Sequence, residues 1–199
     1  MVELRGSAMP HVATTAEAKS ASKDCQFRMA MRKLWEEHIV WTRSVIVSAA
    51  GDLAGVQPDV DRLMRNQVDI GNAIKPYYGS EAGEGLTKLL KEHISGAYEV
   101  IVAAKAGDKH RLDNANKAWY ANADEIAVYL SKANPRYWPE GPMKAHMKDH
   151  LDLTEAAAVV RLQKGWGDDA AAYDKVHDQI LKMADMLSDG IIRQFPEKF

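Results

Sequence analysis

Histidine and asparagine recur at nearly constant intervals along the apolar stripes of this chain. Two series, each with steps of 55 to 57 residues, consist of His38, His93 and His150 and of Asn66, Asn122 and His177. A polar side chain in a buried stripe costs about 1 to 3 kcal/mol unless it finds a partner. Neutral imidazole groups that converge from several helices are also ligands for transition metals. The spacing therefore predicts an interior site for a metal ion or a small ligand.

Helical geometry adds candidate ligands, because residues three or four apart share one face of a helix. Asp174 precedes His177 by three residues, and His146 precedes His150 by four, the spacing at which two imidazole rings can bind one ion. The predicted metal ligands are His38, His93, His146, His150, His177 and Asp174. The predicted polar partners are Asn66, Asp69, Asn122 and Glu125. Since most of these ligands follow residue 140, we expect the site to lie towards the last third of the chain.

The same residues support two other interpretations. Buried polar groups are usually satisfied by hydrogen bonds, so the histidine and asparagine residues could form a network in a bundle with a structural or interaction role and no catalysis. The tryptophan and tyrosine side chains could also wall a cavity for haem or another apolar ligand. Histidine and carboxylate ligands suit zinc, iron, nickel or copper and do not choose among them. No reaction is assigned, so whether the protein is an enzyme stays open.

Six helices must position these side chains, because apolar residues recur at helical spacing from Asp24 onward. The predicted helices run over about 24–51, 58–79, 81–107, 112–133, 142–165 and from 168 onward. Pro76 and Gly79 are predicted to break the second helix, and Asp168 is predicted to be the N-cap of the sixth. The six helices form three tandem hairpins, at about 24–80, 81–139 and 140–199. With only three units, a closed all-α bundle of one domain over 24–199 is favoured over a solenoid. The polar residues 1–23 are predicted to be a flexible tail.

The composition indicates which binding partners and which cellular compartment to expect. The chain has 199 residues, with 28 acidic and 26 basic ones and a net charge of -2, so nothing favours nucleic acid or a membrane surface. Its single cysteine, Cys25, allows no intramolecular disulfide. No apolar run approaches the roughly 18 residues of a membrane span, and no signal peptide is recognisable. We therefore expect a cytoplasmic protein.

Five motifs resemble those of a group of small bacterial all-helical proteins. They are L-W-E-E-H-I-V-W-T-R at 34–43, N-Q-V-D-I-G-N-A-I at 66–74, W-Y-A-N-A-D-E-I at 119–126, A-Y-D-K-V-H at 172–177 and Q-F-P-E-K-F at 194–199. The resemblance covers nearly everything after residue 30. Some members of that group carry a glycosyltransferase label, and the resemblance supplies no catalytic residues.

Overall fold

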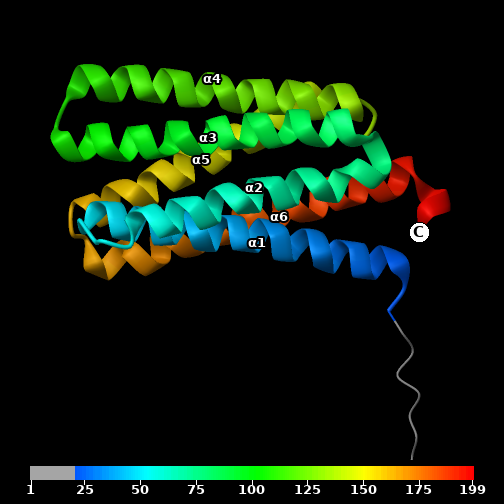
Figure 1. Ribbon diagram of the computed structural model, residues 1–199, viewed down its shortest axis with the longest axis horizontal. Helices are drawn as coiled ribbons and strands as arrows, with labels where there is room; N and C mark the ends of the chain where they lie inside the picture. The colour runs from blue at the N-terminus through cyan, green and yellow to red at the C-terminus, as the bar shows by residue number, and fades with distance from the viewer. Residues whose placement is uncertain (1–20) are drawn as a thin grey trace, which may run out of the picture.

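The computed structural model describes residues 21–199, which form six α-helices and one short 3-10 helix (Figure 1). The helices are α1 (Lys23–Ala50), α2 (Val56–Tyr78), α3 (Ser80–Ala106), α4 (Lys109–Ala133), α5 (Glu140–Leu162), α6 (Trp166–Gln194) and η1 (Pro196–Lys198). No β-strand occurs in this part of the chain. The predicted all-α bundle is therefore confirmed. The predicted tail at 1–23 falls mostly on residues 1–20, which lie outside the described residues.

The helices form a closed ring. Each helix packs against the next one along the chain, and α6 packs against α1, while α1 also contacts α3 and α5. Short connections make neighbouring helices antiparallel, so α1, α3 and α5 run in one direction. Closure places the inner faces of these three helices around a common core, which is where the three histidines of the first series lie.

Three predicted features of the helix ends were wrong, each for a local reason, although Gly79 ends α2 as predicted. Pro76 does not break α2, because it lies in the exposed last turn and the helix continues to Tyr78. Pro142 lies inside the first turn of α5, where a missing N–H costs no hydrogen bond. Asp168 is not an N-cap, since α6 already begins at Trp166 and Asp168 is part of its first turn.

The connection between α4 and α5 is part of the core. Trp138 is 1% exposed, and its indole nitrogen donates a hydrogen bond to the Met186 carbonyl on α6 at 3.4 Å. The buried Asn134 amide donates to the Gly190 carbonyl at 3.0 Å. The proline-rich segment therefore does more than end a helix, because it fixes the end of α6 against α4.

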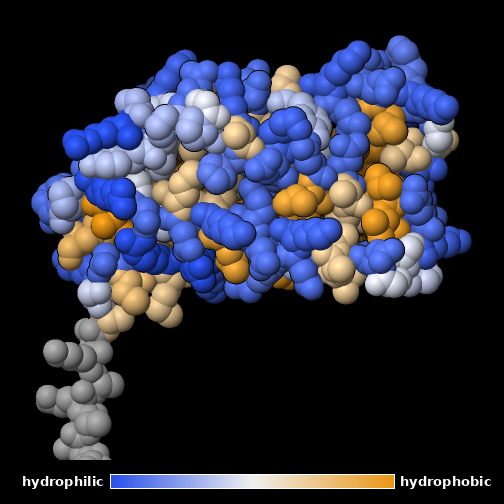
Figure 2. Space-filling model, turned by 180° about the vertical axis from the view of Figure 1, so that it is seen from behind, coloured by the Kyte–Doolittle hydropathy of each residue, from blue (hydrophilic) through white to orange (hydrophobic). Residues whose placement is uncertain are grey.

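The molecular surface is mixed, and Figure 2 shows apolar residues in separate groups among hydrophilic ones on the face that it presents. The exposed large apolar side chains are distributed over α1, the α1–α2 connection, α5 and α6: Met29, Val40, Leu53, Val159 and Trp166. Within residues 21–199, no helix has the length and apolar character needed to cross a membrane.

Candidate functional site

Three histidines meet in the core of the bundle, one from each odd-numbered helix. His38 on α1, His93 on α3 and His150 on α5 are each no more than 3% exposed. The ring centroids of His38 and His150 are 5.9 Å apart, and those of His93 and His150 are 6.3 Å apart. Ring closure of the six helices brings these residues together although more than 50 positions separate them in the sequence.

Each histidine bonds through Nδ1 to a carboxamide oxygen on the following helix. The distances are 3.3 Å from His38 to Gln67 Oε1, 2.9 Å from His93 to Asn122 Oδ1 and 3.1 Å from His150 to Gln179 Oε1. In all three cases the partner lies 29 residues after the histidine. We call each of these pairs an amide clamp.

A second hydrogen bond, from a carboxamide nitrogen to a backbone carbonyl, sets the direction of the amide. Asn122 donates to the Leu89 carbonyl at 3.2 Å, and Gln179 donates to the His146 carbonyl at 3.0 Å. Both carbonyls lie four residues before the clamped histidine. In the first hairpin two residues share the task, since Asn66 donates to the Leu34 carbonyl at 3.0 Å, while Gln67 binds the ring and donates through its amide nitrogen to the Leu63 carbonyl at 2.8 Å.

This direction fixes the tautomer of the histidines. A backbone carbonyl can only accept, so the amide nitrogen must face it and the amide oxygen must face the ring. Nδ1 then carries the proton, and Nε2 keeps its lone pair. Within residues 21–199, the three rings form hydrogen bonds only through Nδ1. Three basic nitrogens are therefore left for another partner.

Burial keeps the three rings neutral. It lowers the pKa of His93 to about 3 and that of His150 to about 4, well below their ordinary 6.5. The pKa of His38 is also lowered well below 6.5, first by burial and then by the neighbouring His150 and His93 rings. The hydrogen bonds to the carboxamides oppose this shift without overcoming it. At neutral pH each ring can thus accept a metal ion or a proton donor.

A small cavity lies between the rings. His38, His93 and His150 line it together with Trp35 and apolar side chains such as Leu90. Its volume of about 10 Å³ is room for about one water molecule or one ion. The indole nitrogen of Trp35 is buried and has no hydrogen-bond partner among the described residues. The wall of the cavity is almost entirely apolar.

The other predicted ligands lie away from this cavity. His177 is half-buried, and its Nε2 lies 3.3 Å from Glu36 Oε1 at the α1–α6 surface. His146 lines a surface hollow between α5 and α6, and Asp174 is exposed. Neither residue lines the histidine cavity. The histidines that come together thus lie in the core of the bundle, and not among the residues of the last third of the chain as expected.

The predicted polar partners divide in the same way. Asn122 is the clamp partner of His93, and Asn66 donates to the Leu34 carbonyl beside the first clamp, whereas Glu125 is exposed and Asp69 is half-buried without lining the cavity. Throughout residues 21–199, no three side chains of histidine, cysteine, aspartate or glutamate are close enough to hold a metal ion as they stand.

Sequence reasoning missed two members of the clamps, Gln67 and Gln179. It aligned His177 with Asn66 and Asn122 by the interval of 55 to 57 residues, and so chose a residue two positions before the one that occupies the site. The constant offset of 29 residues from each histidine leads to Gln67, Asn122 and Gln179 instead. The sequence alone does not select this offset, because Asn66 lies 28 residues after His38 and His177 lies 27 residues after His150.

A second buried polar cluster joins three helices at one end of the bundle. Asp169 in the first turn of α6 is 4% exposed and accepts hydrogen bonds from Arg43 on α1, at 2.7 Å to Nη1, and from Arg161 on α5 at 2.9 Å. The hydrogen bond from Arg43, followed by that from Arg161, holds the pKa of the carboxyl below its ordinary value. Every charge in this cluster is paired, so we assign it to the fold.

Comparison with known proteins adds no name to this geometry: the sequence matches no family model, and no curated protein and no solved structure shows significant similarity to it.

Proposed function

We propose that the protein binds one transition-metal ion on the bundle axis, with Nε2 of His38, His93 and His150 as its ligands. The observation that carries the proposal is the set of three amide clamps. Each clamp holds the proton on Nδ1 and leaves Nε2 basic on a neutral, buried ring. Histidines that bind metals commonly donate their other ring N–H to such a partner, which fixes both tautomer and orientation.

The geometry requires a contraction of the site when the ion binds. Three imidazoles on a tetrahedral ion with N–metal bonds of about 2.0 to 2.1 Å have ring centroids about 5 to 5.5 Å apart. The two measured separations are 5.9 and 6.3 Å. These two pairs must therefore approach by about 0.4 to 1.3 Å, a distance that small side-chain and helix shifts can supply.

Zinc, iron, nickel and copper all accept three imidazole ligands, and the ligand set alone does not select one of them. No carboxylate lines the cavity. Three neutral ligands leave the full charge of the ion in an apolar core, so we expect a fourth ligand, an anion or a water molecule of lowered pKa, whose entry must enlarge the cavity. We do not include haem in the proposal, because a macrocycle needs far more room than about 10 Å³.

Cobalt(II) titration of protein purified without a histidine tag tests the proposal, since tetrahedral cobalt(II) absorbs strongly in the visible range. We expect one ion per chain, displaced by zinc. His38→Gln, His93→Gln and His150→Gln should each weaken binding at least tenfold. His177→Gln is the matched control, because it removes a surface imidazole that does not line the cavity. Wild-type protein that stays metal-free at saturating cobalt and zinc would refute the proposal.

A second candidate function is a bundle in which the clamps only fix the helix register. It is favoured by the fact that every Nδ1 and every clamp amide already has a partner. It predicts that the three His→Gln variants lose stability and that wild-type protein binds no metal. The cobalt titration therefore separates the two candidates in a single experiment.

The motifs behind the resemblance to small bacterial helical proteins contain three of the six clamp residues, His38, Gln67 and Asn122. L-W-E-E-H at 34–38 includes Trp35 and His38, N-Q at 66–67 supplies both amides of the first hairpin, and W-Y-A-N at 119–122 ends on Asn122. We infer that proteins with these motifs share the clamps. We also infer that the three hairpins are copies of one unit, because each contains the same 29-residue contact.

A further inference from the structure

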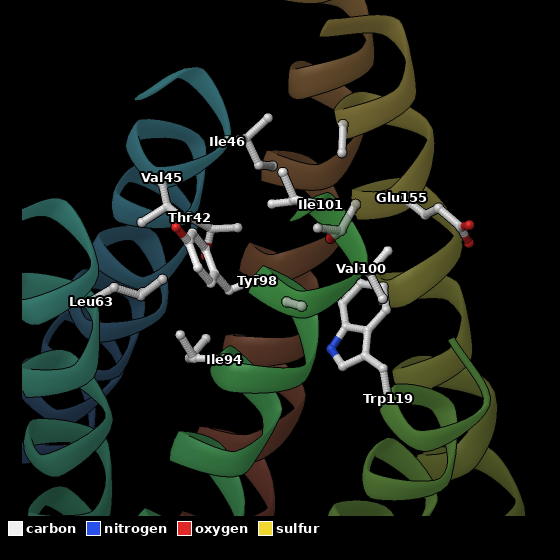
Figure 3. A pocket seen from close by; sticks show the side chains of 13 residues that line it. Thr42, Val45, Ile46, Leu63, Ile94, Tyr98, Val100, Ile101, Trp119 and Glu155 are labelled. Atoms are coloured by element: carbon white, nitrogen blue, oxygen red, sulfur yellow. The ribbon is translucent and has the colours of Figure 1, made fainter. Parts of the chain in front are cut away.

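A second internal cavity lies further along the bundle, between α1, α2, α3, α4 and α5 (Figure 3). Its volume is about 30 Å³, room for about two water molecules or a solute of two to three heavy atoms. Apolar side chains form most of its wall, among them Val45, Ile46, Leu63, Ile94 and Ile101. It is distinct from the histidine cavity, because the two share no lining residue.

The polar groups of this wall are almost all engaged elsewhere. The hydroxyls of Thr42 and Thr154 donate to the His38 and His150 carbonyls, both at 2.7 Å. The Glu155 carboxylate accepts a hydrogen bond from Asn116 at 3.1 Å and is turned away from the cavity in Figure 3. No charged group thus faces the interior, so an ion would lose its hydration without compensation.

One polar group in the wall has no partner. The indole nitrogen of Trp119 is buried and forms no hydrogen bond within the described residues. Figure 3 shows this nitrogen on the side of the ring that is turned towards Ile94 and Tyr98. An unpaired buried N–H is costly, and such groups call for an explanation. A ligand with one acceptor atom could supply the missing partner.

A surface hollow adjoins the cavity. Tyr98 and Ile101 line both the cavity and this hollow, whose other walls include Ser48, Asp52 and Lys105. Tyr98 is only half-buried, so its ring stands between the cavity and solvent. Rotation of this one side chain would open a path to the interior.

We propose that this cavity binds a small uncharged molecule of two or three heavy atoms, apolar or with a single acceptor atom, and that the molecule enters past Tyr98. Size excludes larger ligands, and the lack of a facing charge excludes ions. Apolar cavities stay dry, and a larger one of about 150 Å³ takes up small apolar solutes such as xenon. The inference is independent of the proposed metal site, because none of its steps uses the histidine nitrogens.

Xenon is the probe for the test, with methyl and indole NMR shifts of wild-type protein recorded under increasing gas pressure. We expect saturable shifts at Ile46, Ile94, Ile101 and the Trp119 indole N–H. Ile126 and Ile180 serve as internal references, because they are buried but do not line this cavity. Linear shifts of equal size at all buried methyl groups would mean unspecific uptake and would overturn the proposal.

Two variants fill the cavity from different helices, so the test does not depend on one of them folding. Ala97→Leu on α3 and Ala158→Leu on α5 each place a larger side chain in the wall and should weaken xenon binding at least tenfold. Ala156→Leu, at an exposed position two residues before Ala158, should leave it unchanged. Tyr98→Ala should speed xenon exchange. Unchanged binding in both filled variants would contradict the assignment of the cavity, and unchanged exchange in Tyr98→Ala would contradict the entrance.

Discussion

At the scale of single residues, the amide clamps decide which nitrogen of each histidine is available. A buried imidazole without such a partner could adopt either tautomer and several ring orientations. The clamp removes this freedom by holding the carboxamide between a ring and a backbone carbonyl. The clamps therefore tie a chemical property, the free lone pair on Nε2, to the packing of two helices.

Asn122→Leu tests the clamp where one residue performs both tasks. The change leaves His93 Nδ1 without a partner and removes the additional hydrogen bond to the Leu89 carbonyl, so we expect a loss of about 1 to 3 kcal/mol in the free energy of unfolding. If the metal proposal holds, cobalt affinity should also fall about 10- to 100-fold. Urea denaturation and cobalt titration measure the two effects. Asn114→Leu, at an exposed position on the same helix, should change stability by less than about 0.5 kcal/mol.

Acid should destabilise the protein through the same histidines. The unfolded chain takes up protons near the ordinary pKa of 6.5, whereas in the folded protein His150 stays neutral to about pH 4 and His93 to about pH 3. Their contribution is fully present above pH 6.5 and is lost as the pH falls towards the folded pKa, at about 1.4 kcal/mol per pH unit for each histidine. Urea denaturation of metal-free protein between about pH 7 and pH 5 measures the slope. In His93→Gln it should be shallower, and equal slopes would show that His93 does not take part.

The residues of the clamps were only half predictable from the sequence. The histidines stand out because an apolar stripe surrounds a polar residue at regular intervals. Their partners do not, since glutamine is common on helix surfaces and Gln179 looks like any other amide. Which residue of α6 faces His150 depends on the axial offset between two packed helices, and the interval between hairpins does not determine that offset.

At the scale of the elements, α2 and α3 approach each other at two glycines. A Cβ atom on Gly71 would lie 2.5 Å from the Gly83 carbonyl oxygen, and a Cβ atom on Gly83 would lie 2.5 Å from the Gly71 carbonyl oxygen. Thr87 fills the same space, with its hydroxyl bonded to the Gly83 carbonyl at 2.9 Å. The connection between α2 and α3 is a single residue, Gly79, so these helices have little freedom to move apart.

Gly71→Ala should therefore lower stability although alanine is the better helix former. Relief of the contact with the Gly83 carbonyl requires a backbone shift, for which we expect a cost of about 1 to 3 kcal/mol. Gly141→Ala is the matched control, because no atom lies within 4 Å of the added Cβ atom and the helix gains up to about 1 kcal/mol. Thermal unfolding should move in opposite directions for the two variants. A stabilised Gly71→Ala would mean that the two helices are not in close contact.

The number and approximate extent of the helices followed from apolar periodicity, but their ends did not. Pro142 and Asp168 both carry a strong local preference for a helix start, yet the structure places each inside a first turn. The starts are set by tertiary contacts instead. Trp138 anchors the chain just before α5, and Asp169 needs a position in the first turn of α6 from which it reaches both arginines.

At the scale of the whole molecule, ring closure depends on the seam between α1 and α6, which joins the two ends of the chain. Arg32 and Asp185 form a bidentate pair across it, with both distances 2.6 Å, and Arg28 pairs with Asp189. Arg43 and Arg161 meet at Asp169 near the other end of the seam. The repeat of three hairpins predicts a closed bundle, but no local sequence pattern indicates that residues 43 and 169 are in contact.

The two kinds of ion pair in this seam should differ in strength. Asp169→Asn leaves the guanidinium groups of Arg43 and Arg161, which are only 21% and 23% exposed, without a carboxylate, so we expect a loss of about 2 to 3 kcal/mol. Asp185→Asn breaks a pair whose side chains are 50% and 41% exposed, where solvent screening limits the loss to about 1 kcal/mol or less. Urea denaturation at low and high salt measures both, and only the Asp185 effect should shrink markedly with salt. Equal losses in the two variants would show that the Asp169 cluster does not hold α1, α5 and α6 together more firmly than a surface pair does.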